Sequence, residues 1–212
     1  MDGRHPLATI VRLWRYPVKA LAAEPLDAAR VVATGLEGDR QAALFVSSPG
    51  HARSGKPYRG KEHNLLHTVR STERAIDLAA ERDVSLDERG DGPYFDAGAV
   101  SIVFDIWLAE VEAAAGIALD PLRFRPNLYA RAEPTCTASE SELVGTTLVA
   151  GEVALEVVAP IVRCVTPSYD VATGERDLLV ARAIAERRGN TLGVYCAVRA
   201  PGTLRLGDAL RA

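Results

Sequence analysis

Short apolar segments separated by turn residues are the feature of this sequence that most restricts its fold. Runs rich in Val, Ile, Leu and aromatic residues recur along the chain and end at Gly, Pro, Asn or Asp. This is the pattern of β-strands joined by tight turns. The predicted strands cover residues 8–15, 28–33, 42–46, 99–103, 122–129, 147–149, 153–162, 192–198 and 203–206. The pattern favours a mainly β, α+β domain, built as a closed or nearly closed barrel with helices laid across it.

Three segments have the period of helices instead, at residues 71–82, 105–115 and 177–188. Ser71 can cap the first helix, and Gly116 and Gly189 are suitable C-terminal stops for the other two. No internal repeat is visible, and no linker is long enough to separate two independent domains.

Composition excludes several classes of protein. With 212 residues, 48% of them hydrophobic and 25% charged, the chain can bury one sizeable core. The net charge of -3 argues against a general nucleic-acid-binding protein, although local patches can still be basic. No uncharged run approaches the roughly 18 residues that cross a bilayer, so no membrane association is expected.

The three cysteines, Cys136, Cys164 and Cys196, cannot all pair within one chain. Arg12 and Arg15 interrupt the apolar residues near the N-terminus, which argues against a secretory signal. We therefore expect a reducing, cytoplasmic location. The chain has no C-x-x-C pair, H-E-x-x-H, P-loop or dinucleotide-binding motif, which argues against a zinc finger, a zincin or a nucleotide site of those types.

Cys164 is the candidate reactive residue. The apolar run 153–162 leads directly into Arg163 and Cys164, and Pro167 ends the extended backbone shortly afterwards. The thiol would therefore lie at a strand end, where it can meet a ligand. A nearby positive charge such as Arg163 would favour the thiolate, although neighbours on a strand point to opposite faces. From this segment alone, a buried structural cysteine remains an alternative.

The other two cysteines are interpreted as ordinary. Cys196 alternates with Leu192, Val194 and Val198 on one strand face, so we expect it in the core. Cys136 lies in the polar segment 135–142, and we expect a solvent-facing thiol without a special role.

A basic loop at residues 51–63 is a candidate anion site. It carries Arg53, Lys56, Arg59 and Lys61 together with glycines and two histidines. Cations and flexible backbone N–H groups can wrap an anion. A mobile surface loop is an equally consistent interpretation.

Four other polar residues stand at strand margins or irregularities. Lys19 and Arg40 lie at the margins of predicted strands, and a solvated position is the usual explanation for such cations. Pro126 interrupts the segment 122–129 and indicates an edge or bulge, which can direct Arg125 and Asn127 toward a site.

Taken in order, several motifs resemble the MOSC superfamily, the domain found at the C-terminus of molybdenum cofactor sulfurases and in mitochondrial amidoxime-reducing components. They are Y-P-V-K at 16–19, G-L-E-G-D-R at 35–40, R-F-R-P-N at 123–127, R-C at 163–164 followed by Asp170 and T-G at 173–174, L-G-V-Y at 192–195, and the stretch 202–208. The resemblance covers nearly the whole chain. It implies a MOSC-type β-barrel formed by residues 61–212, with residues 1–60 as an N-terminal β segment packed on it in one compact unit.

The resemblance also implies a cofactor, the molybdenum cofactor (molybdopterin), independent of pyridoxal phosphate. In the amidoxime-reducing branch the matching cysteine ligates molybdenum, so Cys164 is expected to be both metal ligand and catalytic residue. The residues expected to hold the cofactor are Lys19, Arg40, Arg125 and Asn127, with Arg163 beside the cysteine and Arg59 of the basic loop, which can instead bind an anionic substrate. Asp170 is the second catalytic candidate: it would orient a water or a neighbouring side chain, or simply nucleate the turn at Gly174.

Three functions remain open from the sequence. The first is reduction of N-hydroxylated small molecules, with electrons from an external donor protein, because three cysteines cannot supply the four thiolates of a ferredoxin-type cluster. The second is a sulfur carrier or sulfurtransferase, in which a Cys164 persulfide passes on sulfur received from a donor. The third is a non-catalytic cofactor carrier. The oligomeric state is left open.

Overall fold

The computed structural model describes residues 5–212, so residues 1–4 of the expected N-terminal segment lie outside it. The main body is a β-barrel whose strands follow the order β13-β9-β10-β11-β7-β8-β1, closed by pairing of β13 with β1. Strand β2 extends the sheet beside β1. The bounds are β1 Pro6–Arg15, β2 Glu24–Leu26, β7 Val100–Phe104, β8 Leu128–Ala132, β9 Thr147–Ala150, β10 Val153–Val162, β11 Thr191–Ala200 and β13 Ala209–Arg211. The α+β class and the barrel expected from the strand pattern are confirmed.

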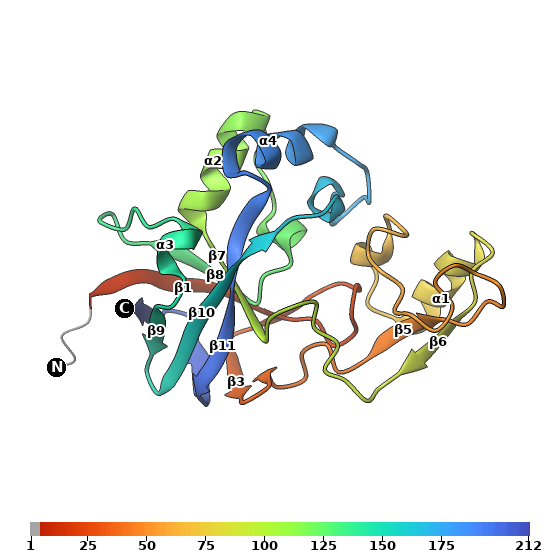
Figure 1. Ribbon diagram of the computed structural model, residues 1–212, viewed down its shortest axis with the longest axis horizontal. Coiled ribbons are helices and arrows are strands. Elements are labelled where there is room, and N and C mark those ends of the chain that lie inside the picture. The colour runs from red at the N-terminus through yellow and green to blue at the C-terminus, as the bar shows by residue number, and fades with distance from the viewer. Residues whose placement is uncertain (1–4) are drawn as a thin grey trace.

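One strand pair of the barrel, β7 with β8, is parallel. Parallel neighbours need a crossover connection, and helix α2 (Asp105–Ala115) supplies it. Helix α4 (Leu178–Arg188) packs against α2, and both lie at one end of the barrel (Figure 1). The short helix α3 (Glu140–Leu143) lies beside β10 and β11.

The helix ends follow the signals in the sequence. Ser71 caps α1 (Thr72–Ala80) by accepting a hydrogen bond from the backbone N–H of Arg74. Gly116 and Gly189 adopt left-handed backbone angles after α2 and α4, as the C-terminal stops require. All three predicted helices are therefore confirmed.

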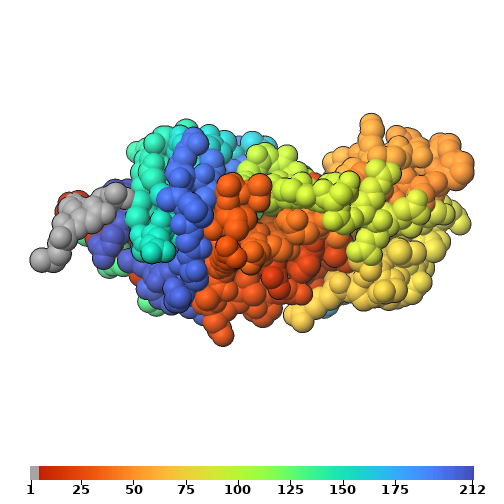
Figure 2. All heavy atoms as spheres, turned by 90° about the horizontal axis from the view of Figure 1, so that it is seen from below, coloured from red at the N-terminus to blue at the C-terminus, as the bar shows by residue number. Residues whose placement is uncertain are grey.

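A small sheet of β12 (Gly202–Arg205), β3 (Ala28–Val32) and β4 (Gly35–Leu36) packs with the barrel core. Strands β5 (Ala43–Val46) and β6 (Leu86–Arg89), helix α1 and the 3-10 turn η1 (Leu66–Thr68) form a lobe with its own hydrophobic cluster. Figure 1 shows this lobe apart from the barrel, and Figure 2 shows it, in orange and yellow, at the opposite end of the molecule from the teal and blue barrel strands.

The expected boundary between residues 60 and 61 falls inside this lobe. Its cluster contains Tyr58 on one side of that boundary and Leu66 on the other. The first strand, β1, is an integral strand of the barrel and does not belong to a segment packed on its outside. The chain therefore enters the barrel, leaves it to build the lobe, and returns.

Two local expectations are wrong. Residues 122–129 do not form one interrupted strand, because Pro121–Phe124 is a 3-10 turn, η2, that Asp120 caps by accepting from the N–H of Leu122. The strand β8 begins only at Leu128. Cys136 is not solvent-facing but buried in the barrel cluster, whereas Cys196 is fully buried as expected. Among the described residues, no helix is long and apolar enough to span a membrane.

Candidate functional site

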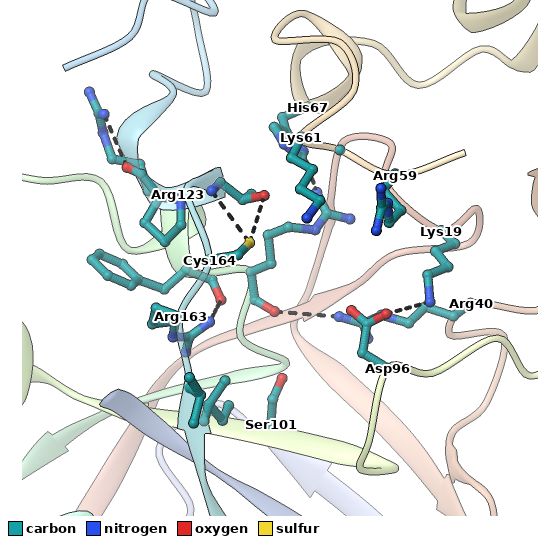
Figure 3. A pocket seen from close by; sticks show the side chains of 18 of the residues that line it. Lys19, Arg40, Arg59, Lys61, His67, Asp96, Ser101, Arg123, Arg163 and Cys164 are labelled. Atoms are coloured by element: carbon teal, nitrogen blue, oxygen red, sulfur yellow. Dashed lines mark hydrogen bonds and ion pairs between the residues drawn. The ribbon is translucent and has the colours of Figure 1, made fainter. Parts of the chain in front are cut away.

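A cavity of about 340 Å³ lies between the lobe and the barrel. The lobe contributes the wall around Arg59 to Lys61 and His67, and the barrel contributes the wall around Phe124, Arg125 and residues 161–167. Figure 3 shows Cys164, Lys61, Arg59 and Lys19 around this one space. The lining cations are Lys19, Arg40, Arg59, Lys61, Arg123, Arg125 and Arg163, and the lining carboxylate is Asp96. The cavity is therefore strongly electropositive.

Cys164 opens into this cavity. Strand β10 ends at Val162, and the turn η3 (Thr166–Ser168) redirects the chain just beyond the cysteine. The thiol is solvent-exposed. Its Sγ lies 3.2 Å from the hydroxyl of Thr166 and accepts the backbone N–H of Thr166 at 3.5 Å. The alternative of a buried structural cysteine is thereby excluded.

Arg163 anchors the cysteine to the rest of the barrel. Its Nε donates to the carbonyl oxygen of Leu192 at 2.7 Å, and its Nη1 donates to that of Phe124 at 2.7 Å. Gly193 makes the approach possible: its φ is +92°, and a Cβ there would lie 3.0 Å from the Arg163 guanidinium. Burial lowers the pKa of Arg163 to about 10, so the group remains charged at neutral pH.

Arg125 is a buried cation of the site that has no carboxylate partner among the described residues. Its Nη1 donates to Nδ1 of His67 at 3.2 Å, but its buried Nη2 has no hydrogen-bond partner. Burial lowers the pKa of Arg125 to about 10, which still leaves it protonated at neutral pH. A buried guanidinium with a free N–H at a cavity wall is suited to binding an anion, because an unpaired buried donor is costly.

His67 stays neutral beside it. Burial first, and then the charge of Arg125, lower the pKa of His67 to about 3. Since a guanidinium has only donors, Nδ1 of His67 must act as the acceptor. Gly60 permits this packing, because a Cβ at Gly60 would lie 2.1 Å from the imidazole ring.

Lys19 and Arg40 form the floor of the cavity. Nζ of Lys19 contacts Asp96 at 2.5 Å, and the Arg40 guanidinium pairs with the fully buried Asp39. The other oxygen of the Asp39 carboxylate, Oδ1, accepts a hydrogen bond from the backbone N–H of Tyr16 at 2.7 Å, which ties the two family-like segments 16–19 and 35–40 together.

The lobe adds Arg59 and Lys61. Arg59 donates to Glu62 from its side chain at 2.9 Å, and its backbone N–H also binds that carboxylate. Lys61 is exposed and makes no hydrogen bond or ion pair within residues 5–212. Part of the basic loop therefore lies at the cavity. From the sequence alone, an anion site and a mobile surface loop were equally consistent interpretations of this loop.

Two expected site residues do not reach the cavity. Asn127 is 1% exposed, and its amide is fully engaged with Ser101 and Trp14. Asp170 accepts from Arg123 at 2.6 Å and from the backbone N–H groups of Ala172 and Thr173. These bonds, led by those in its own turn, lower the pKa of Asp170. Asn127 therefore does not line the cavity, whereas Asp170 orients the Arg123 side chain and supports the turn at Gly174, both of which the sequence left open for it.

Of the seven cations that line the cavity, three form no ion pair with a carboxylate of the described residues. Lys19, Arg40, Arg59 and Arg123 each lie within 4 Å of a carboxylate, contributed by Asp96, Asp39, Glu62 and Asp170. In the described part of the chain, Lys61, Arg125 and Arg163 have no such partner. The cavity thus carries excess positive charge next to an exposed thiol.

Sequence reasoning missed several lining residues: Lys61 as an individual contact, His67, Asp96, Ser101, Arg123 and Tyr195. Arg123 and Tyr195 lie within the motifs 123–127 and 192–195, so their positions could have been extracted from those motifs. His67 and Asp96 stand in irregular segments where no periodicity indicates a direction.

A protein-family model for the MOSC domain matches residues 94–211, more than half of the chain. The crystal structure of the YuaD protein from Bacillus subtilis aligns with 96% of this chain and 94% of its own length, at 18% identity and a TM-score of 0.58. That likeness shows the fold. YiiM from Escherichia coli aligns with 97% of this chain and 69% of its own, at 16% identity and a TM-score of 0.48. A comparison with curated proteins found no match.

Proposed function

Since the chain belongs to the MOSC domain family, we propose that it binds the molybdenum cofactor in the cavity and reduces N-hydroxylated compounds there. The observation that carries the proposal is the exposed thiol of Cys164 beside a cationic cavity that contains a buried, unpaired guanidinium N–H. The cavity volume of about 340 Å³ lies within the usual range for small-molecule sites.

The residues present fit such a group. A cofactor phosphate brings about two negative charges, and a Cys164 thiolate would bring a third. Lys61, Arg125 and Arg163 are the three lining cations without a carboxylate partner among the described residues. Guanidinium forks match phosphate oxygens, and a thiolate is a suitable ligand for a soft metal. No cluster of three or more His, Cys, Asp or Glu side chains suited to a metal occurs in residues 5–212. Cys164 is the protein ligand in this proposal.

The roles follow from position. Arg125, Arg40 and Lys19, which all line the cavity, would bind the phosphate and the pterin. Arg163 would hold the cysteine in place through its bonds to the carbonyls of Leu192 and Phe124. Asp170 would orient Arg123 as a structural support.

The cofactor would supply two-electron chemistry at an N–O bond. In balanced form, a substrate N–OH takes up two electrons and two protons and yields N–H and water. The electrons come from an external donor protein in this proposal. The substrate is a small molecule that reaches Cys164 from the open side of the cavity.

A sulfur carrier is the second candidate, because the exposure of Cys164 favours it. A persulfide that is handed to an acceptor must be reachable from outside, and the Cys164 thiol is. A cofactor carrier without turnover would use the same cavity as the enzyme.

The decisive experiment compares wild type with Cys164→Ser, each purified from a host that makes the cofactor. Cys136→Ala is the matched control, because it removes a buried thiol that belongs to the barrel cluster. We expect molybdenum in wild type and in the control, and a loss of at least about ten- to a hundredfold in metal affinity in Cys164→Ser, since removing even an outer-shell partner of a ligand costs that much.

Two further measurements separate the alternatives. Reduction of an amidoxime by the loaded wild type with a chemical electron donor supports the enzyme, and binding without reduction supports the carrier. Cyanide-releasable sulfur that disappears in Cys164→Ser, without bound molybdenum, would replace the proposal with the sulfur carrier.

A further inference from the structure

Two arginines of the cavity lie over one aromatic ring. Cζ of Arg40 is 4.7 Å and Cζ of Arg125 is 4.3 Å from the centroid of the Tyr16 ring. Tyr16 is completely buried. Its hydroxyl donates to the carbonyl oxygen of Pro126 at 3.0 Å, which fixes the ring to the segment that carries Arg125.

This arrangement brings two like charges together. Nη2 of Arg40 lies 3.5 Å from the carbonyl oxygen of Arg125, so both side chains belong to one corner of the cavity. Asp39 compensates Arg40, but no carboxylate among residues 5–212 pairs with Arg125. The face of an aromatic ring carries partial negative charge and attracts cations, most strongly where water is excluded. Tyr16 therefore adds to the compensation that Asp39 already gives this pair of cations.

The backbone at both arginines is also unusual. Arg40 and Arg125 each have φ of +51°, in the left-handed region that costs a non-glycine residue about 1–2 kcal/mol. The strain persists because neighbouring contacts hold each residue in place: the N–H of Arg40 binds the carbonyl of Tyr16 at 2.6 Å, and that of Arg125 binds the carbonyl of Leu122 at 3.0 Å. Both strained residues carry their side chains to the same ring.

We propose that Tyr16 is a positioning residue that holds Arg40 and Arg125 as a preorganised clamp for a phosphate-type anion. The proposal rests on the proposed function only in that the anion would be the cofactor's phosphate, and it does not depend on the reaction. The clamp binds the anion before any electron transfer, and the contacts of Arg40 and Arg125 with Tyr16 and with the backbone hold its donors in place. Preorganisation of this kind raises affinity by lowering the ordering cost of binding.

The test varies the electron density of the ring at nearly constant shape. Tyr16→Phe keeps the ring face and removes the hydroxyl, and mono-, di- and trifluorinated phenylalanines at position 16 then weaken the ring's attraction for cations step by step. The full chain is purified from a host that cannot make the cofactor, and inorganic pyrophosphate is titrated into each variant by calorimetry. The matched series places the same residues at Phe104, which is buried and stacks on Trp107 at 4.5 Å, with no cation of residues 5–212 over its ring.

We expect Tyr16→Phe to bind pyrophosphate nearly as well as wild type. Each fluorine should weaken binding, to a total of about thirtyfold, which corresponds to the roughly 2 kcal/mol of a desolvated cation–π contact. The Phe104 series should change thermal stability and leave the affinity constant. Affinity that stays flat or rises across the position 16 series would overturn the role of Tyr16 while leaving the proposed function in place. Failure of wild type to bind pyrophosphate would overturn both the clamp and the cofactor site.

Discussion

Asn127→Ala should lower stability sharply while leaving anion binding intact. In wild type Oδ1 of Asn127 accepts the backbone N–H of Ser101 at 3.1 Å and its hydroxyl at 2.9 Å, and Nδ2 donates to the carbonyl of Trp14 at 3.3 Å. These three bonds join β1 and β7 just ahead of β8, in a place that is 1% exposed. A net contribution of about 1 kcal/mol for each bond gives a loss of about 3 kcal/mol, and groups left unpaired add to it.

The assay is urea denaturation followed by tryptophan fluorescence, because Trp14 and Trp107 are both buried. A lower midpoint with an unchanged slope would show a change in stability alone. Pyrophosphate affinity is then measured without urea on the folded variant, and it should equal that of wild type, since Asn127 does not line the cavity.

Asn64→Ala is the matched control. Its amide donates to the carbonyl of Gly174 at 2.9 Å and accepts from Arg82 at 3.0 Å, but the residue is only partly buried. Its loss of stability should stay below about 1 kcal/mol, because water can replace the partners. If Asn127→Ala kept wild-type stability and lost pyrophosphate binding, the structural role inferred for Asn127 would be refuted and the sequence-based role restored.

Two other predictions concern charge. Because burial and the charge of Arg125 lower the pKa of His67 to about 3, the imidazole stays neutral through the range around pH 5.5–7.5 where an ordinary histidine titrates. In a Cys164→Ser background the affinity for sulfate should therefore be constant over that pH range. An affinity that increases as the pH falls, and no longer does so in His67→Gln, would contradict the prediction that His67 stays neutral. Glu140→Ala should cost about 1.5–3 kcal/mol in urea denaturation, because it removes the buried partner of Arg188 Nη2 and frees the N–H of Gly193, while Glu110 still pairs with Nη1 of Arg188. Glu140→Gln keeps an acceptor for Gly193 and should cost less; equal stability of all three proteins would show that the ion pair contributes nothing.

The barrel and the helices could be predicted because local signals agree with the fold. Ser71, Gly116 and Gly189 mark helix ends in the sequence, and each has that role in the structure. Prediction from the sequence failed in two polar segments, around Asp120 and around Cys136. Asp120 and Pro121 start a 3-10 turn that the apolar residues after them conceal. Cys136 lies in a polar stretch, yet it is buried in the barrel cluster.

The sequence predicted several of the charged residues that line the site, but it did not predict the direction in which each side chain of the motif 123–127 points. Lys19, Arg40, Arg125 and Cys164 do line one cavity, as the family-like motifs imply. Asn127 belongs to the same motif as Arg125, but η2 and the left-handed backbone at Arg125 turn the two side chains to different places. Such a turn depends on packing against segments far away in the sequence, and a linear motif carries no information about it.

The pairing that closes the barrel joins segments from the two ends of the described chain: Thr9 stands opposite Ala209 in the ladder. One edge of β1 therefore has no partner until β13 has been synthesised. The barrel cannot close before that point. Contacts of such long sequence separation make folding slow, because a long loop must be closed before they are gained. Until then the exposed edge of β1 is a place where another unfinished chain could pair, so the nascent protein would depend on protection from its neighbours.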